Sequence, residues 1–136
     1  MDKALNYLAL ARKGGLAELG EEPVGAVART GKAYVVLVAG DASDHSWRRA
    51  QSFVSGTSQL CIQTGFTKDQ LGQAIGRTSL AMAAFTDPAL ALAFLKALND
   101  PRNAEAIASL EERTKRIRQR QQEAKAHRRN VKKGKK

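Results

Sequence analysis

The sequence predicts a three-layer α/β/α sandwich with a four-stranded mixed sheet, followed by a basic C-terminal tail that is helical or disordered. Three observations lead to this prediction. Short apolar runs alternate with helical segments over the first hundred residues, two of the runs are apolar along their whole length, and the end of the chain is crowded with cations. We therefore expect one domain in residues 1–100 and a basic extension in residues 101–136.

Apolar spacing and glycine define the elements of the first half. Residues 2–13 carry leucine and alanine at helical spacing and stop at a Gly-Gly pair, and a short strand is expected at residues 16–19. The next helix begins at Gly20, with Val24 on its inward face. Residues 33–40 form an apolar run rich in β-branched residues, which predicts a strand that is covered on both faces.

Short polar residues mark where the later helices begin. Ser43 or Asp44, Thr67 and Asp87 can each accept a hydrogen bond from an amide of the first helical turn. An apolar run precedes or follows each of these helices. We therefore expect helices at residues 43–54, 67–76 and 87–98, and strands at residues 59–64 and 80–86.

The charge of the chain is confined to its C-terminal end. Residues 113–136 contain twelve Lys or Arg and one acid, for a net charge of +11, whereas the first 112 residues sum to −1. We expect the first turns of the extension to pack on the domain, and the rest to stay solvated until phosphates make it helical. The tail is either a solubilising extension or a nucleic-acid arm. We favour the arm, with phosphate contacts from Arg116, Arg118, Arg120, Arg128 and Arg129.

The sequence contains little evidence for a catalytic site. Asp41, Asp44 and His45 could converge on a metal, but carboxylates at such junctions usually end a strand or cap a helix. A lone Cys61 cannot form an intramolecular disulfide, and its mid-strand position favours packing over reactivity. We expect a cytoplasmic protein with no catalytic activity, metal or cofactor, and neither a membrane span nor a signal peptide is recognisable.

The order of the motifs resembles the ribosomal protein L-seven-Ae family, in particular its short bacterial members. The matching pieces are "ALNYLALARKGG", "LGEEPVGAVARTGKAYVVLVAGDAS", "TKDQLGQAIG" and "LAMAAFTDPALALAFLKAL", which lie within residues 4–98. The resemblance implies an α/β/α sandwich and, for many members, recognition of kink-turn RNA without cofactor or catalysis. RNA would be bound by the N-terminal turn of one helix and a nearby loop.

Only part of the family's binding motif is present in this chain. The motif reads approximately Gly-x-Asn-Glu-x-x-Lys: Gly20 matches its glycine, whereas Glu22, Pro23 and Ala26 occupy the three polar positions. The second contact, the loop before the last strand, corresponds to Gly76, Arg77, Thr78 and Ser79.

The two glutamates of the helix start have two possible explanations. A carboxylate there is stabilised by the helix dipole, which alone could account for Glu21 and Glu22. It could also accept the paired N–H donors of a guanine edge. Cations that could reach phosphates from this edge, or that are merely solvated, are Arg12, Lys13, Arg29 and Lys32.

We therefore expect a ribosome-associated RNA-binding protein, monomeric in the absence of RNA, with ribosomal RNA as its partner. The helix start and loop would recognise structured, kink-turn-like RNA, and the tail would add phosphate contacts. The alternative is a protein-interaction module of the same fold that has lost kink-turn specificity.

Overall fold

A computed structural model describes residues 2–134, and the side chains as far as residue 128. Its centre is a four-stranded mixed sheet in the order β1-β4-β2-β3. Strand β2 pairs in parallel with β3 and antiparallel with β4, which in turn pairs antiparallel with β1. The strands are β1 (Ala17–Leu19), β2 (Val35–Val38), β3 (Leu60–Gln63) and β4 (Met82–Phe85).

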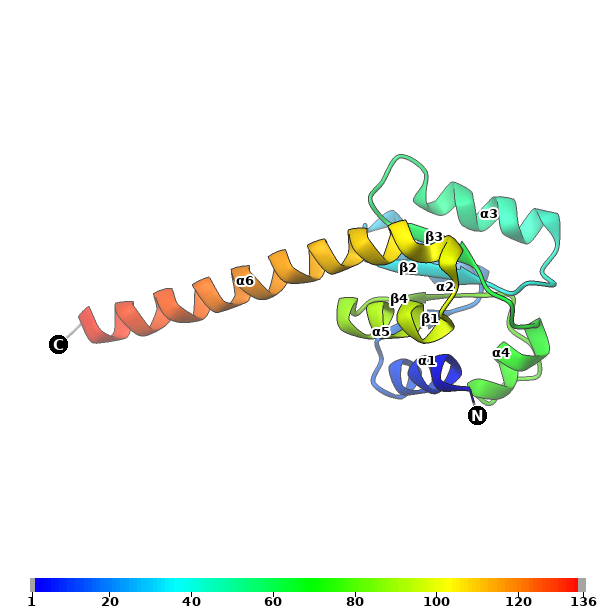
Figure 1. Ribbon diagram of the computed structural model, residues 1–136, viewed down its shortest axis with the longest axis horizontal. Coiled ribbons are helices and arrows are strands. Elements are labelled where there is room, and N and C mark those ends of the chain that lie inside the picture. The colour runs from blue at the N-terminus through cyan, green and yellow to red at the C-terminus, as the bar shows by residue number, and fades with distance from the viewer. Residues whose placement is uncertain (1, 135–136) are drawn as a thin grey trace.

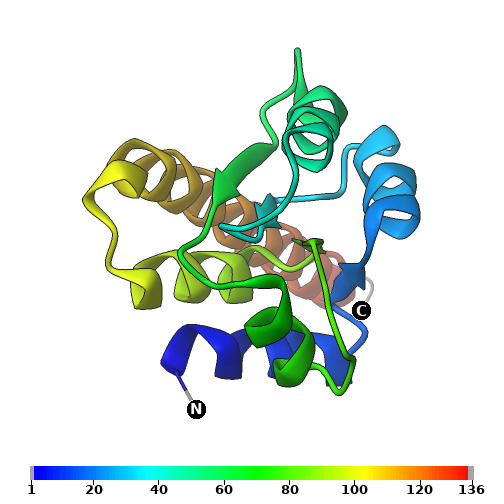
Figure 2. The same cartoon turned by 90° about the vertical axis from the view of Figure 1, so that its right-hand side faces the viewer.

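Helices cover both faces of this sheet, so the predicted three-layer sandwich is confirmed (Figures 1 and 2). Side chains of β2 alternate between the two cores: Val35 and Leu37 face one, and Val36 and Val38 face the other. One layer contains α1 (Lys3–Lys13), α4 (Lys68–Ala74) and α5 (Pro88–Leu98), and the other contains α2 (Glu21–Arg29) and α3 (Asp44–Val54).

The helix starts follow the predicted caps. Ser43, rather than Asp44, caps α3 by accepting a hydrogen bond from Ser46 N at 3.1 Å. Thr67 and Gln70 form a reciprocal capping box on α4, and Asp87 accepts from Leu90 N before α5. These local bonds satisfy amides that have no partner inside their helices.

The C-terminal extension begins with the 3-10 turn η1 (Pro101–Asn103) and continues as α6 (Ala104–Gly134). As predicted, its first turns pack on the domain, where Leu110 and Thr114 are buried. Beyond these turns α6 is one continuous helix that projects from the domain, which is the helical form of the predicted tail (Figure 1). Its residues are mostly strong helix formers, and the docked turns supply the nucleus that an isolated helix lacks. Within residues 2–134, no helix is both long and apolar enough to cross a membrane.

Candidate functional site

The turn between β1 and α2 depends on Gly20. Its φ of 94° lies in the region that favours glycine, and its N–H donates to Met82 O at 3.0 Å, which holds the turn against the start of β4. The first bond of α2 runs from Val24 N to Gly20 O at 3.0 Å. The amides of Glu21 and Glu22 precede that bond and have no partner within the helix, while Pro23 has no N–H.

A second segment, the loop of residues 76–79, lies beside this turn. Arg77 Nη1 is 4.0 Å from the position that a Cβ on Gly20 would occupy. The loop is held by a hydrogen bond from Arg77 N to Gly72 O at 2.8 Å, and a Cβ on Gly72 would lie only 2.6 Å from Ser79 N. The helix start and the loop implied by the resemblance therefore form one surface, which we call the α2 tip: Gly20, Glu21, Glu22, Arg77, Thr78 and Ser79.

The chain shares its fold with an RNA-binding protein. That neighbour is the Giardia lamblia 15.5kD RNA binding protein, with a TM-score of 0.60 and 18% identity over 77% of this chain and 87% of the other. A protein with unknown function from Bacillus halodurans C is also similar, with a TM-score of 0.67 and 21% identity over 74% of this chain and all of the other. No family model matches the chain, and no curated protein is similar to it in sequence. At these identities the similarity establishes the fold alone.

One residue of the α2 tip, Glu21, forms an ion pair that was not predicted from the sequence. Arg49 Nε lies 2.6 Å from Glu21 Oε1, and the same guanidinium lies 5.4 Å from the centre of the Phe53 ring. No local sequence pattern connects Arg49 with Glu21, because the two residues lie 28 positions apart. The charge of Glu21 is thus compensated within the chain, whereas Glu22 is exposed and Arg77 makes no ion pair in the described part of the chain.

Four predicted phosphate contacts lie elsewhere. Ala17, at the start of β1, pairs with Phe85, which also pairs with Val35 at the start of β2. This end of the sheet is opposite the α2 tip. The four cations lie in the helix ends and turns that come just before β1 and β2. The structure therefore places them away from Gly20: Arg12, Lys13, Arg29 and Lys32.

The tail helix also leaves the domain at this opposite end. Arg113 Nη1 donates to Ser58 O at 3.1 Å, just before β3, and its guanidinium lies 5.0 Å from the centre of the Tyr34 ring, just before β2. From there α6 runs away from α4 (Figure 1). Arg116, Arg118, Arg120 and Arg128 are exposed along it, and the side chain of Arg129 lies outside the described residues.

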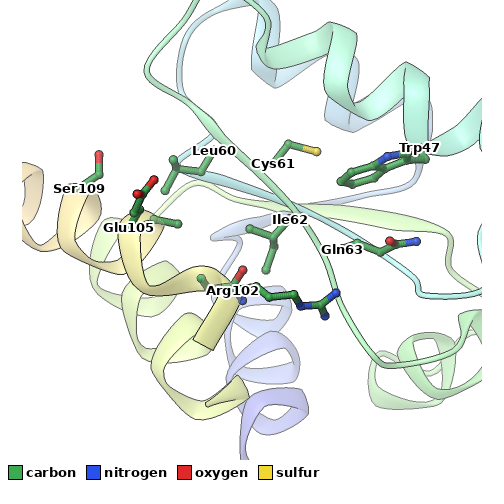
Figure 3. A pocket seen from close by; sticks show the side chains of 10 residues that line it. Trp47, Leu60, Cys61, Ile62, Gln63, Arg102, Glu105 and Ser109 are labelled. Carbon is green, nitrogen blue, oxygen red and sulfur yellow. The ribbon is translucent and has the colours of Figure 1, made fainter. Parts of the chain in front are cut away.

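A cavity of about 570 Å³ follows the outer edge of β3, between α3 and the start of α6. Figure 3 shows Cys61 directed towards Trp47 of α3, whereas Leu60 and Ile62 are directed towards the α6 side. Burial raises the pKa of the Cys61 thiol to about 12, so at neutral pH the thiol stays protonated and is a poor nucleophile.

Of the three residues Asp41, Asp44 and His45, Asp41 has a structural role. Asp41 Oδ1 accepts a hydrogen bond from Lys68 N at 2.8 Å, which ties the end of β2 to the start of α4. Asp44 and His45 lie exposed in the first turn of α3. Across the described residues, no group of three or more His, Cys, Asp or Glu side chains is arranged to hold a metal ion.

Proposed function

We propose that this protein is a cytoplasmic, ribosome-associated RNA-binding protein that recognises structured, kink-turn-like RNA through the α2 tip. The observation that carries the proposal is the position of the Arg77 guanidinium over Gly20, in a fold shared with an RNA-binding protein. The proposed partner is ribosomal RNA, and the protein is proposed to be monomeric without it.

The chemistry of the α2 tip suits a bent nucleic acid. The free amides of Glu21 and Glu22 and the guanidinium of Arg77 are donors for phosphate oxygens. The exposed carboxylate of Glu22 is an acceptor for the N–H groups of a guanine edge. Donors for the backbone and an acceptor for a base therefore lie on one small surface.

The departures from the family motif shape this proposal. Pro23 is exposed and contributes no donor, and the exposed Ala26 replaces a lysine that would reach the backbone. Fewer side chains are then available to read bases, so recognition would depend more on the shape of the RNA and on Arg77. Catalysis has no part in the proposal.

The test compares a kink-turn RNA with a straight duplex of equal length and charge. Arg77→Gln should weaken kink-turn binding about tenfold or more, the usual scale for a hydrogen bond to a charged group, and should affect the duplex less. Glu22→Gln should reduce the preference between the two RNAs. Arg48→Gln is the control, because Arg48 is exposed on α3 and outside the α2 tip. Losses in Arg77→Gln that equal those of the control, or that are the same for both RNAs, would refute the proposal.

The outer edge of β3 favours a second candidate, a protein-interaction module. β3 is the last strand of the sheet, and its outer edge lines the cavity between α3 and α6 (Figure 3). An edge strand can pair with an extended segment of another protein. A defined protein partner that stays bound through nuclease and high salt, and that is lost when Cys61 or Gln63 is replaced by proline, would support this candidate. Retention by both proline variants would exclude it.

A further inference from the structure

Three arginines of α6 and one tyrosine of the domain surround a second cavity, of about 350 Å³. Arg113, Arg116 and Arg120 occupy positions i, i+3 and i+7 of the helix, so they lie on one of its faces and span about 10 Å of its axis. Tyr34 forms the domain side, and Ile117 completes the lining. We call these five residues the arginine cluster.

The cluster is anchored to the domain, unlike the exposed length of α6 beyond it. Arg113 is half-buried, donates to Ser58 O at 3.1 Å and stacks at 5.0 Å from the Tyr34 ring. Ile117 is also half-buried, and Thr114 between them is buried. The domain therefore fixes the orientation of this face of the helix, and a ligand would bind without first having to order the chain.

Within the described residues no carboxylate lies within ion-pair distance of the cluster, although the exposed Glu112 precedes Arg116 by one helical turn. Glu111, two residues before Arg113, is paired with Lys96 at 3.0 Å. Glu123 accepts a hydrogen bond from Gln119 Nε2 at 3.3 Å and lies outside the cavity lining. Three guanidinium groups that stay charged at neutral pH are thus held together without an ion-pair partner among the residues whose side chains the structure describes. Their mutual repulsion would be relieved by an anion that carries several charges.

We propose that the arginine cluster is a second RNA-binding site, which holds the phosphate backbone of a strand beyond the one bound at the α2 tip. This inference rests on the proposed function and extends it. A guanidinium matches a phosphate in bidentate geometry, and a row of three over about 10 Å suits a polymer of phosphates better than a single small anion.

The location of the cluster determines which RNA can use both sites. Tyr34 and Ser58 precede β2 and β3, whereas the α2 tip lies at the other end of the sheet. The four residues of β2 alone cover about 13 Å. A short RNA that occupies the α2 tip therefore does not reach the cluster. An RNA with a longer arm running along the domain reaches it.

The experiment uses two doubly substituted variants of the full chain with equal charge. Arg116→Gln with Arg120→Gln changes the cluster, and Lys115→Gln with Lys125→Gln changes the opposite face of the same helix. Binding is measured over a range of salt concentrations with two kink-turn RNAs, one with a short arm and one with a long arm. Circular dichroism checks that each variant retains its helix content.

The cluster variant should bind the long-arm RNA about tenfold more weakly than the unaltered chain, and the slope of log affinity against log salt should fall by about two. The opposite-face variant should lose less than about threefold, and neither variant should change short-arm binding. Equal losses in the two variants, or competition by polyglutamate or anionic vesicles as effective as that by RNA, would overturn the inference. Failure of the unaltered chain to bind either RNA would instead overturn the proposed function.

Discussion

Arg49 and Glu21 join the two helices of one layer, with Nε and Oε1 2.6 Å apart. The pair crosses from the middle of α3 to the first turn of α2, directly beside Gly20. It therefore determines how much negative charge the α2 tip presents to an incoming phosphate. Both side chains are more than a third exposed, so the pair stabilises the fold only weakly, by about 0.2–1 kcal/mol.

Removal of Arg49 should weaken RNA binding by exposing an uncompensated carboxylate. We expect Arg49→Gln to lower the affinity for kink-turn RNA by roughly three- to tenfold while lowering the free energy of unfolding by less than about 1 kcal/mol. Glu21→Gln added to it should restore most of the affinity. Fluorescence anisotropy of labelled RNA with the single and double variants measures how far the effects of Arg49 and Glu21 on RNA affinity depend on each other. A double variant that binds no better than Arg49→Gln would show that Glu21 plays no electrostatic part.

The loop of residues 76–79 should depend on the absence of a side chain at Gly72. In Gly72→Ala the new Cβ would meet Ser79 N at 2.6 Å, which requires the backbone to move. We expect a loss of about 1–3 kcal/mol in the free energy of unfolding, measured with urea, together with weaker RNA binding as Arg77 shifts. Gly65→Ala is the matched control, because a Cβ there meets nothing within 4 Å. Equal stability of the two variants would contradict the close contact.

Cys61 should make stability depend on pH in the alkaline range. Burial raises the pKa of its thiol from 9.0 to about 12, so above pH 9 the unfolded chain loses a proton that the folded chain keeps. The stabilisation is fully present below pH 9 and is lost progressively as the pH rises towards 12. Cys61→Ala should show a smaller decrease in the free energy of unfolding between pH 8 and pH 10.5 than the unaltered chain. The same decrease in both proteins would contradict the burial of the thiol.

Two truncations should separate the docked part of α6 from the projecting part. Deletion of residues 121–136 removes cations but leaves Leu110, Thr114 and the Arg113 contact, so the Tm should hardly change. Deletion of residues 113–136 also removes the buried Thr114 and should lower the Tm by several degrees.

The same truncations report on the tail's share of RNA binding. If about six tail cations engage phosphates, the log-log salt slope of the tail contribution is near −4, and deletion of residues 113–136 should flatten the measured slope by about that much. A slope that does not change on this deletion would show that the tail makes no electrostatic contact with RNA.

The sequence by itself determined the elements of the sandwich and where each begins. Apolar runs such as Val35–Val38 are buried at every position because helices cover both faces, and polar residues such as Thr67 cap the next helix through bonds to amides only three residues away. These are local relationships, and a local pattern records them. The concentration of charge beyond residue 112 is likewise a property of the sequence alone.

Only the tertiary structure decided which side chains meet. The pairing of Arg49 with Glu21 depends on how α3 packs on α2, and the stacking of Arg113 on Tyr34 depends on where α6 crosses the sheet. Strand direction explains the position of Arg12 and Lys32: β1 and β2 both start at the end of the sheet opposite Gly20, so the segments before them carry their cations there. A run of residues specifies its own period and caps, but strand order and helix packing set the distances between runs.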